Sequence, residues 1–427
     1  MAAKGLLGAT VKLVPMLLLL GCGGAGEGRL NQAAAPAREP PGQTLHVAPS
    51  ADCVTVEPCY ASVQEALDAA SDGDLIKVAA GAYTTTAPQV ARIEKGVHLI
   101  GGYHPQDWSR SDPGTNVTVL DAEAVPGRRG VAIDGPMATP IKLAGFRIQR
   151  GYAQGSDGGG IHIAGGSVVL EDNTVTKGAA DGCGGGVFVS DGQVTMRRNR
   201  MEANAAAYGG GLCVAGGSVS VEGDVLMGNE ARPSGGAIAV SGGSLSGANV
   251  TVAGNPLAGA GVYLTGGEVT GIHWTLADNG QYGAVATLGV ETDRGSAGFV
   301  NTIVASHRRG FFGSGVVAHR TLFHDVDNPC MAGASCVSNL FGDPQFLDPA
   351  QGDYRIGPDS AAINQGYGTE VVTDTEGGPR PVGAAPDLGA HEARPGEMVA
   401  DESVAATPGD RRVYLPLVLR RAVAAGP

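Results

Sequence analysis

Short runs of alternating apolar and polar residues cover most of the chain, and glycine-rich turns separate them. In a strand, side chains two positions apart lie on one face, so each run predicts a short strand with one buried face. Outside the middle of the chain, the runs span residues 75–78, 97–100, 117–120, 131–133 and 141–148. Many short strands with few helical segments predict an all-β fold.

Between residues 158 and 288 the runs repeat at a nearly constant step. A glycine-rich segment recurs with its third position at 160, 186, 211, 237 and 261, in steps of 26, 25, 26 and 24 residues. Repeats of fixed period stack into a solenoid, and parallel crossovers are strongly right-handed. The sequence therefore predicts a right-handed parallel β-helix with three strands per coil and regular coils over 158–288.

Aligned by this step, the coils stack apolar residues in inward-facing columns. The third strand contributes Val175, Met201, Leu226, Val252 and Leu276. Three positions later stand Gly178 and then Asn204, Asn229, Asn255 and Asn279. Because asparagine tolerates left-handed turns and can bond to stacked copies of itself, we expect a structural ladder of these four residues.

One segment has helical spacing instead. Ser62 and Glu65 form a capping-box pattern, and Val63, Leu67 and Ala70 share one helical face. The first coil of a β-helix would otherwise expose an unpaired edge, so we expect a short capping helix there.

Composition narrows the partners. The chain has 70 glycines, and aromatic residues make up 5%, which predicts a narrow aliphatic core. The formal charge is −13, and removal of residues 1–21 with Lys4 and Lys12 changes it to −15. A strongly acidic protein repels phosphate backbones, so we expect no nucleic-acid partner.

The N-terminus has the pattern of an export signal. Lys4 and Lys12 flank an apolar stretch at 13–20, which is too short to span a bilayer. Leu19-Leu20-Gly21-Cys22 resembles the lipobox of bacterial lipoproteins. The resemblance implies cleavage before Cys22, lipidation of its thiol, and a place at the outer membrane or cell surface. An ordinary signal peptide with an incidental cysteine is the alternative. Residues 22–43 then read as a flexible tether.

The cysteines fit an oxidising compartment. Cys53 lies close to Cys59 in the sequence, and Cys330 lies close to Cys336, so each pair could close a small disulfide loop or remain as free thiols. Cys183 and Cys213 lie in neighbouring coils but about five positions apart along the coil, so we expect no bond between them. No cysteine–histidine cluster indicates zinc, and we expect no metal and no cofactor.

Two resemblances follow from these motifs. Leu226-Met227-Gly228-Asn229 and Gly235-Gly236-Ala237-Ile238 resemble the repeats of polymorphic outer-membrane proteins, which are adhesins. Segments 341–349, 352–356, 360–366, 378–381 and 387–392 resemble secreted bacterial β-helix proteins of the choice-of-anchor Q type. Such proteins carry varied surface anchors. The resemblance implies a β-helix over 44–340, a C-terminal closing region over 341–393 and a flexible tail over 394–427. The apolar segment 413–421 in this tail is either a sorting signal or a β-strand.

The outward columns are the places where catalytic residues would lie. In β-helix lyases and hydrolases, catalytic carboxylates cluster on the outer face of a strand. The outward column of the first strand has none; it holds His162, Phe188, Cys213, Ala239 and Tyr263. We therefore assign no catalytic residue. In this alignment Phe188 and Tyr263 are exposed, and together with His162 and Tyr208 they are candidate glycan contacts. We favour the alternative that the aromatic rings fill space between coil and loop.

These observations favour an exported, lipid-anchored protein with a non-catalytic structural, adhesive or glycan-contacting role. A polysaccharide lyase or glycoside hydrolase is the main alternative, with acids from the irregular coils at 97–150 or 299–330. A scaffold that binds surface proteins is a third possibility.

The lipobox leads to a direct prediction. Cys22→Ala removes the only thiol at the predicted cleavage site, so labelled fatty acid should no longer enter the protein. Gly23→Ala, one position later, should leave labelling intact. Incorporation that survives in Cys22→Ala would contradict the anchor.

Overall fold

The computed structural model describes residues 42–394, apart from Thr55, Pro136, Ala138, Gly235, 257–259, 281–284 and 288–294. The predicted signal peptide, Cys22, most of the tether and the tail segment 413–421 lie outside these residues.

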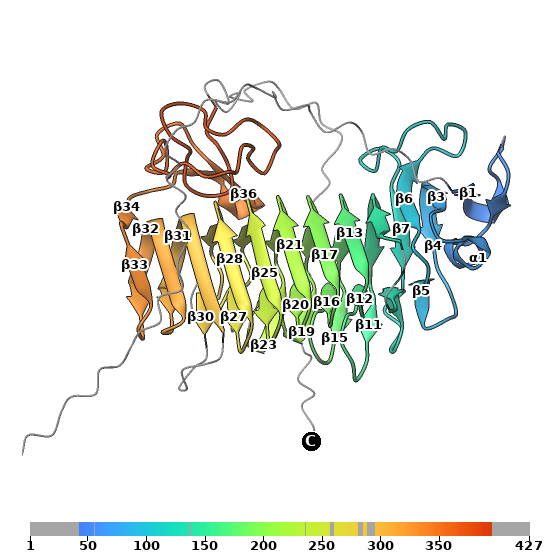
Figure 1. The fold of residues 1–427 in the computed structure, drawn as a ribbon, viewed down its shortest axis with the longest axis horizontal. Coiled ribbons are helices and arrows are strands. Elements are labelled where there is room, and N and C mark those ends of the chain that lie inside the picture. The colour runs from blue at the N-terminus through green and yellow to red at the C-terminus, as the bar shows by residue number, and fades with distance from the viewer. Residues whose placement is uncertain are drawn as a thin grey trace, which may run out of the picture. The chain divides into compact units, whose positions relative to one another are not determined.

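The described chain winds into a right-handed parallel β-helix with three strands per coil, as the repeat predicts (Figure 1). Each strand pairs in parallel with its counterpart one coil away. Ile161 pairs with Val187, Val187 with Leu212, and Leu212 with Ile238, which is the register expected from the glycine-rich repeat.

Successive coils build three sheets, which we call the first, second and third sheets in the order of the strands within a coil. The first sheet contains β5 (Gln89–Ile93), β8 (Arg129–Ile133), β12 (Ile161–Ile163), β16 (Val187–Val189), β20 (Leu212–Val214), β24 (Ile238–Val240), β27 (Val262–Leu264), β30 (Val285–Thr287) and the last parts of β31 (Ser296–Phe312) and β32 (Val316–Met331). The second sheet contains β1 (Thr44–Val47), β3 (Leu75–Ala79), β6 (His98–Tyr103), β9 (Ile141–Ala144), β13 (Ser167–Glu171), β17 (Gln193–Arg197), β21 (Ser218–Glu222), β25 (Ser244–Ala248), β28 (Glu268–Ile272), the first parts of β31 and β32, and β33 (Ser335–Val337). The third sheet contains β4 (Gly81–Tyr83), β7 (Thr118–Asp121), β10 (Phe146–Gln149), β14 (Thr174–Thr176), β18 (Arg200–Glu202), β22 (Val225–Met227), β26 (Thr251–Ala253), β29 (Thr275–Ala277), the middle parts of β31 and β32, and β34 (Leu340–Phe341).

Smaller elements lie beside these sheets. A fourth, short sheet contains β11 (Tyr152–Ala153), β15 (Ala179–Ala180), β19 (Ala205–Tyr208) and β23 (Glu230–Ser234). The remaining elements are β2 (Cys59–Tyr60), α1 (Val63–Ala69), β35 (Phe346–Asp348), β36 (Asp353–Ile356) and the short 3-10 turns Pro49–Ala51 and Pro349–Gln351.

Sharp corners separate the second sheet from the third. The predicted run at 141–148 is two strands, β9 and β10, because Gly145 turns the chain with φ +74°. Gly223 makes the same corner after β21 with φ +66°, and the other equivalent corners in later coils use side-chain-bearing residues in the same left-handed region, with φ between +52° and +57°. They are Asp172, Arg198, Asn249, His273, Asn301 and Arg320. Apart from the coils with Gly145 and Gly223, each of these coils therefore projects one corner side chain at the same edge.

The asparagines of the third strand form a buried ladder. The Nδ2 group of Asn204 donates to Oδ1 of Asn229 at 3.0 Å, and Asn229 donates to Asn255 at 3.1 Å. Asn255 continues the chain to Asn279 at 2.7 Å, and the backbone N–H of Asn279 donates to Nε2 of His307 at 3.2 Å. Stacked amides thus satisfy one another inside an otherwise apolar core.

A second buried ladder was not predicted. Asn173 donates to Asn199 at 3.1 Å, and Asn199 donates to Oδ1 of Asp224 at 2.9 Å. In each asparagine, Nδ2 also donates to a carbonyl oxygen of the second sheet, Leu143 or Leu170. Asp224 ends this ladder with a fully buried carboxyl whose Oδ2 has no hydrogen-bond partner.

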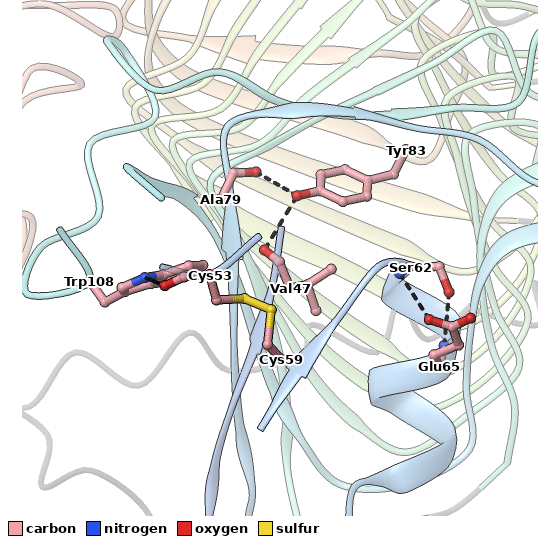
Figure 2. The surroundings of a disulfide bond; sticks show 8 residues. All are labelled: Val47, Cys53, Cys59, Ser62, Glu65, Ala79, Tyr83 and Trp108. Atoms are coloured by element: carbon pink, nitrogen blue, oxygen red, sulfur yellow. Dashed lines mark hydrogen bonds between the residues drawn. A yellow bond between two sulfur atoms is a disulfide. The ribbon is translucent and has the colours of Figure 1, made fainter. Parts of the chain in front are cut away.

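The N-terminal end is covered by α1, which begins with the predicted capping box: Ser62 Oγ accepts from the Glu65 N–H, and Glu65 accepts from the Ser62 N–H (Figure 2). Val63, Ala66 and Leu67 of this helix are buried against the first coil. Beside it, a disulfide joins Cys53 to Cys59, and the indole N–H of Trp108 donates to the Cys53 carbonyl at 3.4 Å. The predicted capping helix is confirmed.

Asp224 makes stability depend on pH. Complete burial raises its pKa from 3.8 to about 7, so the folded protein holds the proton that the unfolded chain releases. Its contribution to stability is fully present below about pH 4 and falls as pH rises to about 7. Asp224→Asn keeps the ladder geometry without a titrating group, so it should be more stable than the parent above pH 7, by at most roughly 4 kcal/mol. Urea unfolding at pH 5 and pH 8 measures this, and a difference independent of pH would contradict it.

Candidate functional site

The four candidate glycan contacts do not form an exposed surface. Phe188 and Tyr263 are each only 7% exposed, so the expectation that they are exposed is wrong. His162 is half-buried and lies 5.3 Å from the Phe188 ring, measured between ring centroids. Tyr208 is 40% exposed, and its ring stacks on Tyr263 at 6.4 Å.

The glycine-rich connections cover this outward column. At Gly184, φ is +71°, and a Cβ there would lie 2.9 Å from Cβ of Phe188. At Gly185, a Cβ would lie 2.3 Å from the carbonyl oxygen of Ala205 in the fourth sheet. Only glycine lets the chain pass between the first sheet and the fourth, so the connection packs over the outer face of the first sheet. The repeat that identifies the fold thus buries the aromatic residues.

Cys183 and Cys213 were expected not to bond, and this expectation is wrong because the glycine-rich connection packs over the first sheet. The structure joins them in a disulfide, with Cα atoms 5.7 Å apart. Cys183 lies in the connection that folds back over the first sheet, beside Gly184, so the five positions of sequence offset are not an offset in space. The structure also pairs Cys330 with Cys336.

The closing region packs on the outer face of the third sheet. It contacts the corner residues one coil at a time: Nδ2 of Asn249 donates to Thr373 O at 2.8 Å, and Asn301 exchanges two hydrogen bonds with the backbone of Tyr367 at 2.8 Å each. Arg320 donates to the carbonyl of Gln365. Beneath these bonds, Ala253, Ala277, Ile303 and Ala305 pack against Tyr354, Ile356, Ala362 and Leu388.

A buried ionic cluster holds this region together. Arg380 lies 3.2 Å from Glu392, and both side chains are fully buried. Arg380 also donates to the carbonyl oxygens of Asp387 and Gly389 and lies 2.7 Å from Nδ1 of His273, a corner residue. Burial, helped by Arg380, lowers the pKa of His273 to about 3, so its ring is neutral. The motif residues 378–392 therefore fasten the closing region to the coil.

The described residues leave the rest of the third sheet's outer face uncovered, and we call this part the open face. Its outward side chains come from β7, β10, β14, β18 and β22. They are Val119, Asp121, Arg147, Gln149, Thr174, Thr176, Arg200, Glu202, Val225 and Met227. The same sequence alignment that predicted the inward columns places Thr174 and Arg200 in one outward column of the third strand, and the structure adds Arg147 to it. The sequence therefore carried a signal for this face, although the predicted contacts came from the first strand and the turns beside it.

Two hollows bound the open face. One, of about 270 Å³, lies where Pro113 and Gly114 of the β6–β7 loop face Arg147 and Thr174. The other, of about 440 Å³, lies where residues 349–352 and Tyr354 of the closing region face Arg200 and Met227. The β6–β7 loop and the closing region thus bound the open face at its two ends.

Arginine neutralises the carboxylates on and beside the open face. Arg200 pairs with Glu202 at 2.6 Å, and Arg198 with Asp172 at 2.8 Å. Burial alone would raise the pKa of Asp121, but hydrogen bonds from Arg150 and Gln149 outweigh burial and hold the pKa below its usual value. Arg147 is exposed and has no ion-pair partner among the described residues. Within that same part of the chain, the carboxyls with a raised pKa, Asp224, Asp387 and Glu392, are all buried.

Acids of the irregular coils do not gather into a site either. His324 lies 3.4 Å from Asp325 and 3.7 Å from Asp343, and both carboxylates are largely exposed. Over the described ranges, no group of three His, Cys, Asp or Glu side chains could hold a metal ion. No helix in the described part of the chain is long and apolar enough to span a bilayer.

A family comparison agrees with this fold. A family model described as a right-handed β-helix region matches residues 116–257. No curated protein matches the sequence. Among solved structures, the crystal structure of pectate lyase Pel9A is similar over 82% of this chain and 96% of that chain, at 15% identity and a TM-score of 0.42. The A-module of the Azotobacter vinelandii mannuronan C-5 epimerase AlgE4 is similar over 66% of this chain and 92% of that chain, at 14% identity and a TM-score of 0.31.

The ionic cluster predicts a large effect from a small change. Glu392 accepts from the backbone N–H groups of Val382 and Asp387 as well as facing Arg380. Glu392→Gln leaves Arg380 buried without this partner and turns an amide donor toward another donor, so it should lower the free energy of unfolding by about 3 kcal/mol or more. Glu222→Gln, in an exposed pair with Arg197, should change it by less than about 0.5 kcal/mol. Equal effects in thermal or urea unfolding would contradict the assignment.

Proposed function

We propose that this protein is a lipid-anchored cell-surface β-helix protein whose open face binds an extended glycan without cleaving it. The observation that carries the proposal is the open face itself: a walled, uncovered stretch of sheet that presents guanidinium, amide and hydroxyl groups. Five coils contribute to it, so at a spacing of about 4.8 Å it extends for roughly 20 Å.

The side chains suit a sugar chain. Arg147, Gln149, Thr174 and Thr176 supply donors and acceptors at regular intervals, as hydroxyl-rich ligands require. Val225 adds apolar surface at the far end, where the flat face of a sugar ring can pack, and the neighbouring Met227 packs partly against the closing region. The residues are held by paired strands, so the spacing of these groups is set before a ligand arrives.

The state of the carboxyls supports binding rather than hydrolysis. A glycosidase needs one carboxyl whose pKa is raised enough to donate a proton and a second that stays ionised. Asp121 on the open face and Glu171 beside it have lowered pKa values, because hydrogen bonds from neighbouring groups outweigh the effect of burial. Neither is suited to act as a general acid.

Attachment to the membrane is the second part of the proposal. It rests on the lipobox at Cys22, and residues 22–43 would hold the β-helix away from the bilayer. The acidic composition argues against a nucleic-acid ligand. A surface-protein partner in place of a glycan is an outcome that the binding experiment distinguishes.

Binding should depend on the two arginines of the open face. The double variant Arg147→Ala/Arg200→Ala removes charge-assisted hydrogen bonds worth about 1.5–3 kcal/mol each, so affinity for a bound glycan should fall roughly tenfold or more. Arg197→Ala, on the second sheet, is the matched control and should bind like the parent. A glycan array identifies the ligand, and titration of each variant measures the affinity.

The same glycans test for cleavage. Incubation of the parent protein with each bound polysaccharide should release no oligosaccharides. Release that the double variant abolishes would replace the proposal with the lyase or hydrolase alternative. Absence of any glycan on the array would remove the glycan as the ligand.

A further inference from the structure

Among the described residues, nothing covers the C-terminal end of the core. Phe341 stands in the inward column of the third strand, one coil after Phe323, and the two pair in register. Phe323 is 2% exposed, whereas Phe341 is 73% exposed, because no later coil in the described chain covers it. Cys330, Cys336 and Val326 at the same end are also only partly buried. The closing region, expected to close the solenoid, lies on the outer face of the third sheet instead.

The last strands also lack a neighbour on one side. Within the described residues, β33 and β34 each pair with β32 alone. A stack of aromatic rings, Trp274, Phe299, Phe311 and Phe323, runs through the core and ends at the exposed ring of Phe341. An open edge beside an apolar surface favours association with another strand.

We propose that residues 413–419 of the same chain add to this edge as a final strand beside β34 and cover Phe341. Val413, Leu415, Leu417 and Leu419 alternate with Tyr414, Pro416 and Val418. In a strand, the first set shares one face and would pack on the open core. The structure at Phe341 thus favours the β-strand interpretation of this segment over a sorting signal.

The position of Pro416 fits an edge strand. Backbone N–H groups point alternately toward the neighbouring strand and away from it. If Leu415 and Leu417 donate to the sheet, the missing N–H of Pro416 falls on the solvent side, where proline is tolerated. The proline would then also prevent addition of a further strand.

The connecting segment is long enough. Arg394 is bound to Asp374 at 2.7 Å, and the neighbouring Thr373 bonds to Asn249. The coil of Asn249 lies four coils before β34, a distance of roughly 19 Å along the axis. Residues 395–412 can span up to about 60 Å when extended, so the segment reaches the edge with slack.

Charge agrees with a parallel orientation. Arg420 and Arg421 follow the apolar segment directly. In a strand parallel to β34 they would lie at its carboxyl end, where Asp325 and Asp343 have side chains that are 78% and 57% exposed. The opposite charges would then meet at one corner.

Tryptophan fluorescence of the full chain tests this proposal. The native tryptophans, Trp108 and Trp274, are both buried, so the indole introduced by Phe341→Trp reports on the open end. If the tail covers this indole, its emission is blue-shifted and acrylamide quenches it poorly. Adding Leu415→Asp/Leu417→Asp should expose the introduced indole and raise the quenching constant several-fold. Val404→Asp/Ala406→Asp adds the same charges at the same spacing and should leave the protection intact.

Each possible result supports or overturns the tail strand. Equal quenching with and without the Leu415→Asp/Leu417→Asp change, or a loss of protection in the control as well, overturns the proposal. Sedimentation of the same samples identifies a second copy: protection that increases with concentration and accompanies a dimer means that another chain covers the end. Protection in a monomer that only the leucine changes abolish supports the tail strand. Circular dichroism of each variant verifies that the β-helix remains folded.

Discussion

Hydrogen bonding between parallel strands about 4.8 Å apart is the constraint on which the rest of this structure depends. A strand satisfies its backbone through the coils before and after it, so each side chain meets its own counterpart one coil away. Apolar residues are buried by these counterparts, and the amides of Asn204, Asn229 and Asn255 satisfy one another. Where a column ends, its last residue lacks a counterpart in the next coil. The buried carboxyl of Asp224 then has an oxygen without a hydrogen-bond partner, and the ring of Phe341 is exposed to solvent.

This constraint explains what could be predicted. The strand registers follow from the spacing of Gly160, Gly186 and Gly211, because one slipped residue would turn an apolar column outward. The capping helix follows from local signals at Ser62 and Glu65. The second ladder was missed although Asn173 and Asn199 keep the step, because Asp224 and then Val250 interrupt it after two coils. Periodicity therefore reveals a column only when enough coils repeat it.

Contacts that do not repeat from coil to coil could not be predicted from the sequence. The bond between Cys183 and Cys213 depends on a connection that folds back over the first sheet. The salt bridge between Arg380 and Glu392 belongs to a network of carbonyl groups and a histidine that joins residues more than a hundred positions apart, such as Arg380 and His273. The extent of the open face depends on the β6–β7 loop and the closing region, which bound it. Neither of these two segments has a sequence repeat from which its position beside the third sheet could be predicted.

The attachment of the closing region to successive corners has a consequence for how such a protein can change in length. Each of four successive coils bonds to the closing region through its own corner residue, Asn249, His273, Asn301 or Arg320. A coil inserted or deleted among them would therefore misalign the later corner residues with their partners in the closing region. Among the described residues, the corners before Gly223 have no such bonds to the closing region. Duplication there would leave the fastening intact and lengthen the open face by one coil, or about 4.8 Å. The length of the open face can therefore evolve in steps of one coil, independently of the contacts that attach the closing region.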